Sequence, residues 1–180
     1  TVPKKADPSA GSAPRSEAAA GAGSPQAAVA FSAQALAKIP FDRAKYETVT
    51  TTTRLSEWIE AARSSGRVAF DTESTSTDPH RAEMVGFSLA VAPGQACYVP
   101  LQHRDGASDL FGGGGLVANQ ISLGEALQLI KGLLEDASVV KIGQNIKYDL
   151  LVMARHGISL APIDDTMLLS YALDAGRGNN

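Results

Sequence analysis

The sequence has little cysteine, few aromatic residues and no excess of positive charge. Its 180 residues hold one cysteine, Cys97, which excludes an internal disulfide and a zinc site built from cysteines. A formal net charge of −3 excludes a histone-like or polybasic chain, but not a nucleic-acid enzyme with an acidic metal centre beside a basic groove. The chain has no run of about 18 apolar residues, so we expect no membrane span. The lone cysteine favours a reducing compartment.

Two parts of the chain differ in composition. Residues 1–38 are rich in Ala, Ser, Gly and Pro, and they contain almost no large apolar side chains. Such a segment cannot bury enough surface to offset the entropy of ordering it, so it is predicted to be a flexible linker. The folded domain is predicted over residues 39–180. Because the chain begins at Thr1 rather than Met, we expect a piece of a longer protein or a processed chain. No apolar stretch follows its two early lysines, so we expect no signal peptide.

The folded part alternates between patterns typical of strands and of helices. A helix is predicted after Thr52 or Thr53 and ends at Gly66, and further helices are expected around 123–134, 146–156 and 166–173. Strands are predicted at 46–50, 67–71, 84–91, 96–101, 138–143 and 158–163. From residue 67 the order is therefore β-β-β-α-β-α-β-α, which predicts an α/β domain with helices packed on a mixed sheet.

Two carboxylates stand at the end of the first core strand. Asp71 and Glu73 lie in the run Val68-Ala-Phe-Asp-Thr-Glu, and side chains two apart on a strand point to the same face. They repel each other unless a cation lies between them, and hard oxygen ligands suit Mg²⁺ or Mn²⁺. A solvated strand end is the alternative interpretation, and the Asp-x-Glu pair alone does not exclude it.

A second group of polar residues opens the helix after the fifth of these strands. Asn145 and Asp149 are four apart and are expected to share a helical face, whereas Ile146, Leu150 and Met153 are expected to face the sheet. The alternative is an ordinary polar face of an amphipathic helix.

Taken together, the strand-end carboxylates and the polar residues that open the helix predict a metal cluster. If a later strand returns beside the first core strand, Asp71, Glu73 and Asp149 meet. Such a cluster is stable only around cations. Two divalent ions about 3.5–4 Å apart activate a water molecule and stabilise the leaving oxygen of a phosphodiester.

Six basic side chains are candidate phosphate contacts, with an ordinary solvated surface as the favoured alternative for each. They are Arg81, His103, Arg104, Lys141, Lys147 and Arg155. His156 is expected to be a favourable partner of a helix C-terminus, and Asp164 or Asp165 is expected to cap the last helix.

Three motifs in combination carry a resemblance to a known family. They are Phe70-Asp-Thr-Glu, then Lys141-Ile-Gly-Gln-Asn-Ile-Lys-Tyr-Asp, then Asp165-Thr-Met-Leu-Leu-Ser-Tyr. Over residues 41–178 the chain resembles the proofreading 3′–5′ exonuclease domains of bacterial DNA polymerase I enzymes, in the DEDD nuclease superfamily. The resemblance implies a ribonuclease H-like fold, in which a mixed sheet of three antiparallel strands followed by parallel strands is flanked by helices.

The resemblance also implies roles for individual residues. Asp71 and Glu73 would be catalytic metal ligands, and Asp149 would hold a second ion, partly through water. Gln144, Asn145 and Tyr148 would lie near the bound 3′ end. The implied cofactor is a pair of Mg²⁺ or Mn²⁺ ions. The implied substrate is a single-stranded DNA 3′ end, from which 5′-nucleotides are released.

The third motif of the family, Tyr-x-x-x-Asp, is not found in the 180 residues, because Tyr171 and Asp174 are three apart. We therefore expect a C-terminally truncated domain that is impaired without the fourth acidic ligand. The resemblance implies polymerase and 5′-nuclease domains in the same parent chain, in the bacterial cytoplasm with the nucleoid, and no membrane partner. Two alternatives stay open: a non-catalytic module that binds single-stranded DNA, and an RNA-directed 3′–5′ exonuclease of the same superfamily.

Overall fold

The computed structural model describes residues 42–106 and 114–173, and the predicted linker over residues 1–38 lies outside this part of the chain. The strands are β1 (Glu47–Thr48), β2 (Arg67–Ser74), β3 (Met84–Ala92), β4 (Gln95–Pro100), β5 (Val140–Gly143) and β6 (Ile163–Asp165). The α-helices are α2 (Thr52–Ser65), α3 (Leu123–Leu134), α4 (Lys147–Ala154) and α5 (Thr166–Leu173), preceded by a short 3₁₀ turn at Arg43–Lys45. The predicted order of strands and helices is confirmed. Within the described ranges no helix is long and apolar enough to cross a membrane.

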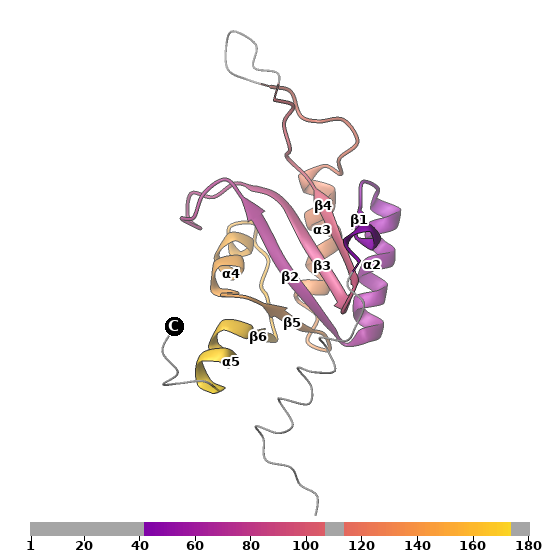
Figure 1. Ribbon diagram of the computed structural model, residues 1–180. Coiled ribbons are helices and arrows are strands. Elements are labelled where there is room, and N and C mark those ends of the chain that lie inside the picture. Colours follow the sequence, from indigo (N-terminus) through magenta and orange to yellow (C-terminus); the bar gives the residue numbers. More distant parts are fainter. Residues whose placement is uncertain (1–41, 107–113, 174–180) are drawn as a thin grey trace, which may run out of the picture. The chain divides into compact units, whose positions relative to one another are not determined.

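All six strands form one mixed sheet in the order β1-β4-β3-β2-β5-β6 (Figure 1). β2 runs antiparallel to β3, and β3 runs antiparallel to β4. β5 returns beside β2 in parallel, and β6 continues the parallel half next to β5. The predicted change from antiparallel to parallel pairing is therefore confirmed, and β2 is the strand at which the change occurs.

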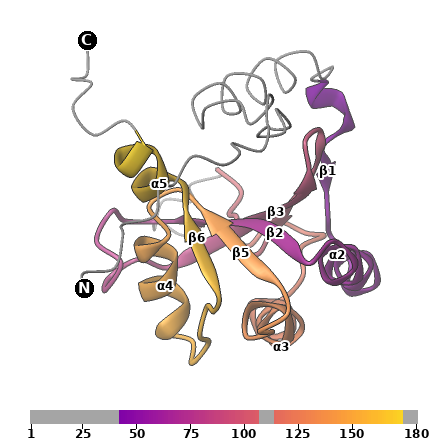
Figure 2. The same ribbon diagram turned by 90° about the horizontal axis from the view of Figure 1, so that it is seen from below.

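Three helices cover one face of this sheet. α2, α3 and α4 lie together on that face, whereas α5 lies on the other side, next to β6 (Figure 2). α5 has no buried residue. Its large apolar side chains are exposed to solvent: Met167, Leu168, Leu169, Tyr171 and Leu173. Most of the second sheet face is therefore free of helices in the described part of the chain.

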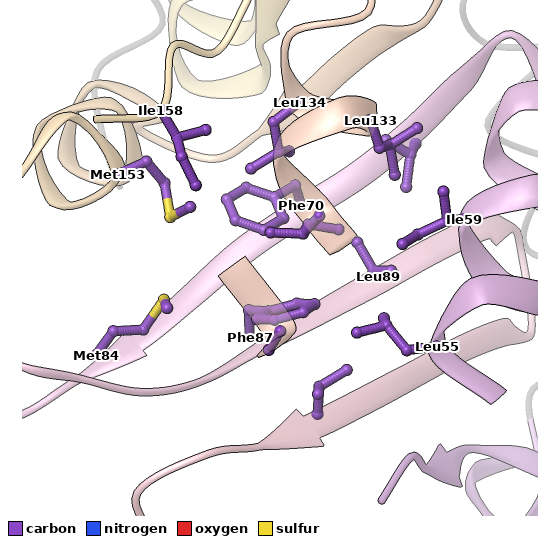
Figure 3. Close-up of a cluster of buried hydrophobic side chains, with 14 of the residues drawn as sticks. Leu55, Ile59, Phe70, Met84, Phe87, Leu89, Leu133, Leu134, Met153 and Ile158 are labelled. Carbon is purple, nitrogen blue, oxygen red and sulfur yellow. The ribbon is translucent and has the colours of Figure 1, made fainter. Parts of the chain in front are cut away.

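The core lies between the sheet and α2, α3 and α4 (Figure 3). β2 alternates strictly: Val68, Phe70 and Thr72 are buried, while Asp71 and Glu73 are on the opposite face. The rings of Phe70 and Phe87 pack with their centroids 5.8 Å apart. Each such buried side chain contributes about 1.5–3 kcal/mol, so this face of β2 is held firmly and the direction of the two carboxylates is fixed with it.

Capping residues set the ends of the first two α-helices. Gly66 ends α2 with a left-handed φ of 69°, as predicted. The N-cap of α2 is Thr51, one residue before the predicted position, and its hydroxyl accepts a hydrogen bond from the Arg54 N–H at 3.3 Å. Ser122 caps α3 by accepting from the Glu125 N–H, as its capping-box sequence predicts.

The predicted strand over residues 158–163 is wrong. Ile158 and Leu160 are buried, and Ser159 between them is exposed, so the segment has the alternation of a strand while its backbone is irregular. Pairing with β5 begins only at Ile163. The burial of two side chains under a loop explains the misleading pattern.

Lys141 of β5 is buried rather than available to a phosphate. Its side chain is 0% exposed, and its Nζ donates hydrogen bonds to the carbonyl oxygens of Asp136 and Val139, both at 2.7 Å, and of Ala161. Three backbone acceptors satisfy the three donors of an ammonium group. Lys141 therefore joins the segments on both sides of β5. Both interpretations of Lys141, a phosphate contact and the favoured solvated surface, are wrong.

Candidate active site

The site begins where β2 extends beyond the end of β5. β2 pairs with β5 only over residues 67–69, whereas its pairing with β3 continues to Ser74. At Gly143 the chain leaves the sheet toward α4, and a Cβ at this position would lie 2.8 Å from Cγ1 of Ile146, so a residue without a side chain suits the turn. Crevices at the carboxyl ends of parallel strands are common ligand sites in open α/β sheets.

Asp149 of α4 occupies the position that a longer β5 would have taken. Its Oδ1 accepts hydrogen bonds from the Thr72 backbone N–H at 2.8 Å and from the Thr72 hydroxyl at 2.6 Å. Asp149 is 2% exposed and lies on the buried face of α4 with Val152 and Met153. The prediction that Asp149 lies on a separate polar face is therefore wrong. Its burial is tolerated because the carboxylate has two donors.

Burial and neighbouring charge both act on the acids. Burial raises the pKa of Asp149 above its ordinary value, the negative charge of Asp71 raises it further, and the two hydrogen bonds from Thr72 oppose these effects. Burial also raises the pKa of Asp71. The carboxylates on the two faces of β2 therefore lie close enough to repel each other, and a cation beside them would relieve that repulsion.

Asp71 and Glu73 lie on the other face of β2, and neither carboxylate has a hydrogen-bond or ion-pair partner in the described part of the chain. Unpaired carboxylates on one face are suitable donors for a hard divalent cation. Across residues 42–106 and 114–173, however, no three His, Cys, Asp or Glu side chains form a group that could hold a metal ion. Of the three predicted acids, Asp71 and Glu73 therefore share one face of β2, and Asp149 is hydrogen-bonded to Thr72 from the other side.

A cleft of about 450 Å³ lies at the end of β2, beside Glu73. Among its lining residues are three that the sequence singled out: Glu73, Asn145 and Tyr148. The Tyr148 hydroxyl is hydrogen-bonded to the Ser74 hydroxyl and donates to the Ser76 carbonyl oxygen. The loop that follows β2 is therefore tied to α4, and the tie closes one side of the cleft.

Asn145 is not on the helix but in the turn before it, with a left-handed φ of 54°. Its backbone N–H donates to Asp165 Oδ1 at 3.0 Å, and the same oxygen accepts from the Met167 N–H at 2.9 Å. Asp165 thus caps α5, as predicted, and also holds the β5–α4 turn. The expectation that Asn145 and Asp149 share a helical face is wrong, because the helix starts at Lys147.

A second cleft, of about 490 Å³, includes Asp71 and Gln144 among its lining residues. The Thr166 hydroxyl is hydrogen-bonded to Gln144 Oε1, and it lies 3.1 Å from the Gly143 carbonyl oxygen. Gln144 is therefore held at the start of α5, on the Asp71 side of the strand rather than beside Tyr148.

Apart from His103, whose ring contacts Tyr98, the remaining basic candidates divide into two groups. Arg155 donates to the carbonyl oxygens of Pro79 and Ala82, and Arg104 donates to the carbonyl oxygen of Gly114 at 3.0 Å. These two guanidinium groups hold loops. The side chains of Arg81 and Lys147 are exposed, and within the described residues neither forms a hydrogen bond or an ion pair.

Sequence reasoning missed two features of this region. Thr72 was treated only as the spacer between two acids, although its place in the β2 alternation could have identified it as a polar side chain that faces the core. The other feature is a hydrogen bond of 2.6 Å between the Tyr98 hydroxyl and His103 Nε2. No local pattern in the sequence indicates this contact.

Comparisons with known proteins identify the family of this chain. A family profile described as 3′–5′ exonuclease matches residues 46–179. The chain is 50% identical over 167 residues to DNA polymerase I of Rhizobium leguminosarum. The match covers 88% of this chain and 16% of that protein. It is 38% identical over 133 residues to DNA polymerase I of Pseudomonas aeruginosa, and this match covers 72% of this chain and 14% of that protein. The chain thus spans only a small part of the length of these relatives.

A solved structure of similar fold is Escherichia coli RNase D, described as an exoribonuclease involved in structured RNA processing. The TM-score is 0.52 at 22% sequence identity, and the match covers 74% of this chain and 30% of that one. The likeness confirms the predicted α/β, ribonuclease H-like arrangement of a mixed sheet with helices.

Proposed function

This chain belongs to the 3′–5′ exonuclease family, and from that premise we propose that it is the proofreading exonuclease domain of a DNA polymerase I. It removes nucleotides from a single-stranded DNA 3′ end and releases 5′-nucleotides. The observation that carries the proposal is the set of acids around Thr72: Asp71 and Glu73 on one face of β2, and Asp149 bonded to Thr72 from the other. Identity to two DNA polymerase I chains supports DNA as the substrate.

Asp71 and Glu73 would hold a first Mg²⁺ or Mn²⁺ ion, because their carboxylates have no other partner in the described residues. Asp149 would hold a second ion, partly through water, since only its Oδ1 is taken by Thr72. A pair of divalent ions at such a site supplies an activated water molecule and stabilises the leaving 3′ oxygen. The protein contributes the fixed direction of the two carboxylates on β2.

The 3′ end of the strand would enter the cleft beside Glu73. Asn145 and Tyr148 line this cleft, and Gln144 stands at the adjacent one. Each can donate or accept hydrogen bonds to a sugar or a base. We propose that these three residues orient the last nucleotide, so that its phosphodiester lies over Asp71 and Glu73.

The setting follows from the relatives. Both are DNA polymerase I chains several times longer than this one. We propose that the domain works beside a polymerase domain and a 5′-nuclease domain of its parent chain, on nucleoid DNA in the bacterial cytoplasm.

A second candidate is a module that binds single-stranded DNA without cutting it. One observation favours it: the described residues contain no group of three side chains that could hold a metal ion. On this hypothesis the 180-residue stretch binds the strand through its clefts, independently of added metal.

The test is digestion of a 5′-labelled single-stranded oligodeoxynucleotide by the parent polymerase and by the 180-residue chain, with Mg²⁺ or Mn²⁺ and with EDTA. Glu73→Gln in the parent is expected to slow shortening from the 3′ end by about 100-fold or more, because a metal ligand is lost. Glu60→Gln is the matched control, since Glu60 is an exposed carboxylate on α2.

Three outcomes decide between the candidates. Metal-dependent shortening that Glu73→Gln abolishes and Glu60→Gln leaves intact supports the exonuclease. Equal rates for both variants contradict it. Tight binding that needs no metal, without cleavage by the parent, favours the binding module. An RNA strand of the same sequence, digested faster than the DNA, would assign the activity to RNA instead.

A further inference from the structure

A tyrosine on the open face of the sheet reaches from β4 toward the acids of β2. The strand register places Tyr98 opposite Ser88, and Ser88 opposite Asp71. In the next row Glu73 is opposite Gly86. The Tyr98 hydroxyl occupies the space that a Cβ on Gly86 would fill, so the ring lies diagonally across β3 and ends in the row of Glu73.

A histidine fixes the hydroxyl in this position. The Tyr98 oxygen and His103 Nε2 are 2.6 Å apart, and the two rings meet edge to face at 87°. Gln120 in turn holds the backbone of His103 from both sides: the His103 N–H donates to Gln120 Oε1 at 2.8 Å, and Gln120 Nε2 donates to the His103 carbonyl at 3.0 Å. The phenol therefore has a defined place on the sheet.

The surroundings of Glu73 leave its carboxylate in need of support. No described residue donates a hydrogen bond to it or forms an ion pair with it, and the β2–β3 register shifts directly after it, between Glu73 and Ser74. A tyrosine hydroxyl has one O–H donor besides its acceptor oxygen. The Tyr98 hydroxyl, over Gly86, therefore stands in the same row of the sheet as an unpaired carboxylate.

We propose that Tyr98, held by His103, is a positioning residue that orients the Glu73 carboxylate toward the metal. With the His103 Nε2–H donating to the phenolic oxygen, the Tyr98 O–H is left to donate to one oxygen of Glu73. The other oxygen then faces the cation. Partners of this kind commonly change metal affinity by 10–100-fold. The inference rests on the proposed function, because it takes Glu73 as a metal ligand.

The test compares Tyr98→Phe, His103→Ala and Glu73→Gln with wild type. Tyr171→Phe is the matched control, because Tyr171 on α5 is 75% exposed. Mn²⁺ binding to the 180-residue chain is followed by electron paramagnetic resonance of the free ion. In the parent polymerase, exonuclease rates are measured against both Mn²⁺ and oligonucleotide concentration. Thermal midpoints check that each variant is folded.

For Tyr98→Phe we expect Mn²⁺ binding about 10-fold weaker, a higher Mn²⁺ concentration for half-maximal cleavage, and a lower kcat. KM for the oligonucleotide should change less than about 2-fold, since the phenol acts through Glu73. His103→Ala should shift the same quantities in the same direction, and Tyr171→Phe should shift none of them.

The outcomes separate this inference from the proposed function. If Tyr98→Phe and Tyr171→Phe have the same Mn²⁺ binding and exonuclease rates while Glu73→Gln is inactive, the inference is overturned and the proposed function stands. A raised KM with unchanged Mn²⁺ dependence makes Tyr98 a substrate contact and also overturns it. If Glu73→Gln keeps full Mn²⁺ binding and full activity, both the inference and the proposed function are overturned. Weaker Mn²⁺ binding by Tyr98→Phe supports the inference even if no form cleaves DNA, and undetectable Mn²⁺ binding by wild type overturns it.

Discussion

Thr72 donates both its backbone N–H and its hydroxyl to one oxygen of Asp149, at 2.8 and 2.6 Å, and so joins two residues that are 77 positions apart. The acceptor belongs to a helix and the donors belong to the strand between the two exposed acids. This contact fixes α4 against β2 at the point where β5 has ended. It also sets how far Asp149 lies from Asp71 and Glu73.

Removing the Thr72 hydroxyl tests this contact. Thr72→Val keeps the shape of the side chain but leaves the buried Asp149 carboxylate with one donor instead of two. We expect a loss of about 1–3 kcal/mol in the free energy of unfolding, measured by urea denaturation. The control is Thr48→Val on β1, where the threonine is exposed. Equal stability of the two variants would contradict the role assigned to Thr72.

The left-handed backbone of Asn145 gives a second prediction. With φ at 54°, an alanine at this position is strained, whereas a glycine is not. Asn145→Ala is therefore expected to be less stable than Asn145→Gly by about 1 kcal/mol in thermal unfolding. Both variants lose the amide, so both should bind the 3′ end more weakly. Identical stability would mean that the turn relaxes to another conformation.

His156 makes stability depend on pH. Burial, assisted by the charge of Arg155, lowers its pKa below the ordinary value of 6.5. Between the lowered pKa and pH 6.5, the unfolded chain therefore binds a proton at His156 and the folded chain does not. The contribution of His156 to stability is therefore fully present above pH 6.5 and is lost as the pH drops from 6.5 through the lowered pKa.

His156→Gln should flatten this part of the curve in urea denaturation between pH 7.5 and about pH 5. Replacing the exposed His80 in the same way should keep the slope of the wild type. A His156→Gln profile parallel to that of the wild type would refute the assignment.

The buried lysine gives a fourth prediction. Lys141→Met removes the Nζ donor from the carbonyl oxygens of Asp136, Val139 and Ala161, of which that of Asp136 keeps the Val139 N–H as a donor. We expect a loss of at least about 2 kcal/mol, because buried unsatisfied groups each cost about 1–3 kcal/mol. Lys147→Met on the exposed side of α4 should change stability by less than about 0.5 kcal/mol. Similar losses for both variants would argue against the three-carbonyl contact.

The sequence predicted those parts of the fold that local patterns determine. Gly66, Ser122 and the alternation of β2 act through neighbouring residues, so the end of α2, the start of α3 and the shared face of Asp71 and Glu73 were predicted correctly. The order of strands and helices along the chain was also predicted correctly. The segment around Ile158 was assigned wrongly, because two buried side chains under a loop repeat the alternation of a strand.

The parts of the site that were missed depend on distant contacts. Asp149 is buried because Thr72 needs an acceptor beyond the end of β5, and no spacing within the helix indicates where β5 ends. The position of Tyr98 likewise depends on a glycine in a neighbouring strand and on a histidine in the following loop. Both contacts need the tertiary structure.

The central place of β2 in the sheet has a consequence for how the molecule opens. β2 has a hydrogen-bonded strand on both sides through Ala69 and a packed face beneath it, whereas α5 buries no residue. Amide hydrogen exchange should therefore be slowest along β2 and fast in α5, since local opening follows buried contact. The Gln144–Thr166 side of the crevice, at the start of α5, is then expected to open more readily than the paired part of β2.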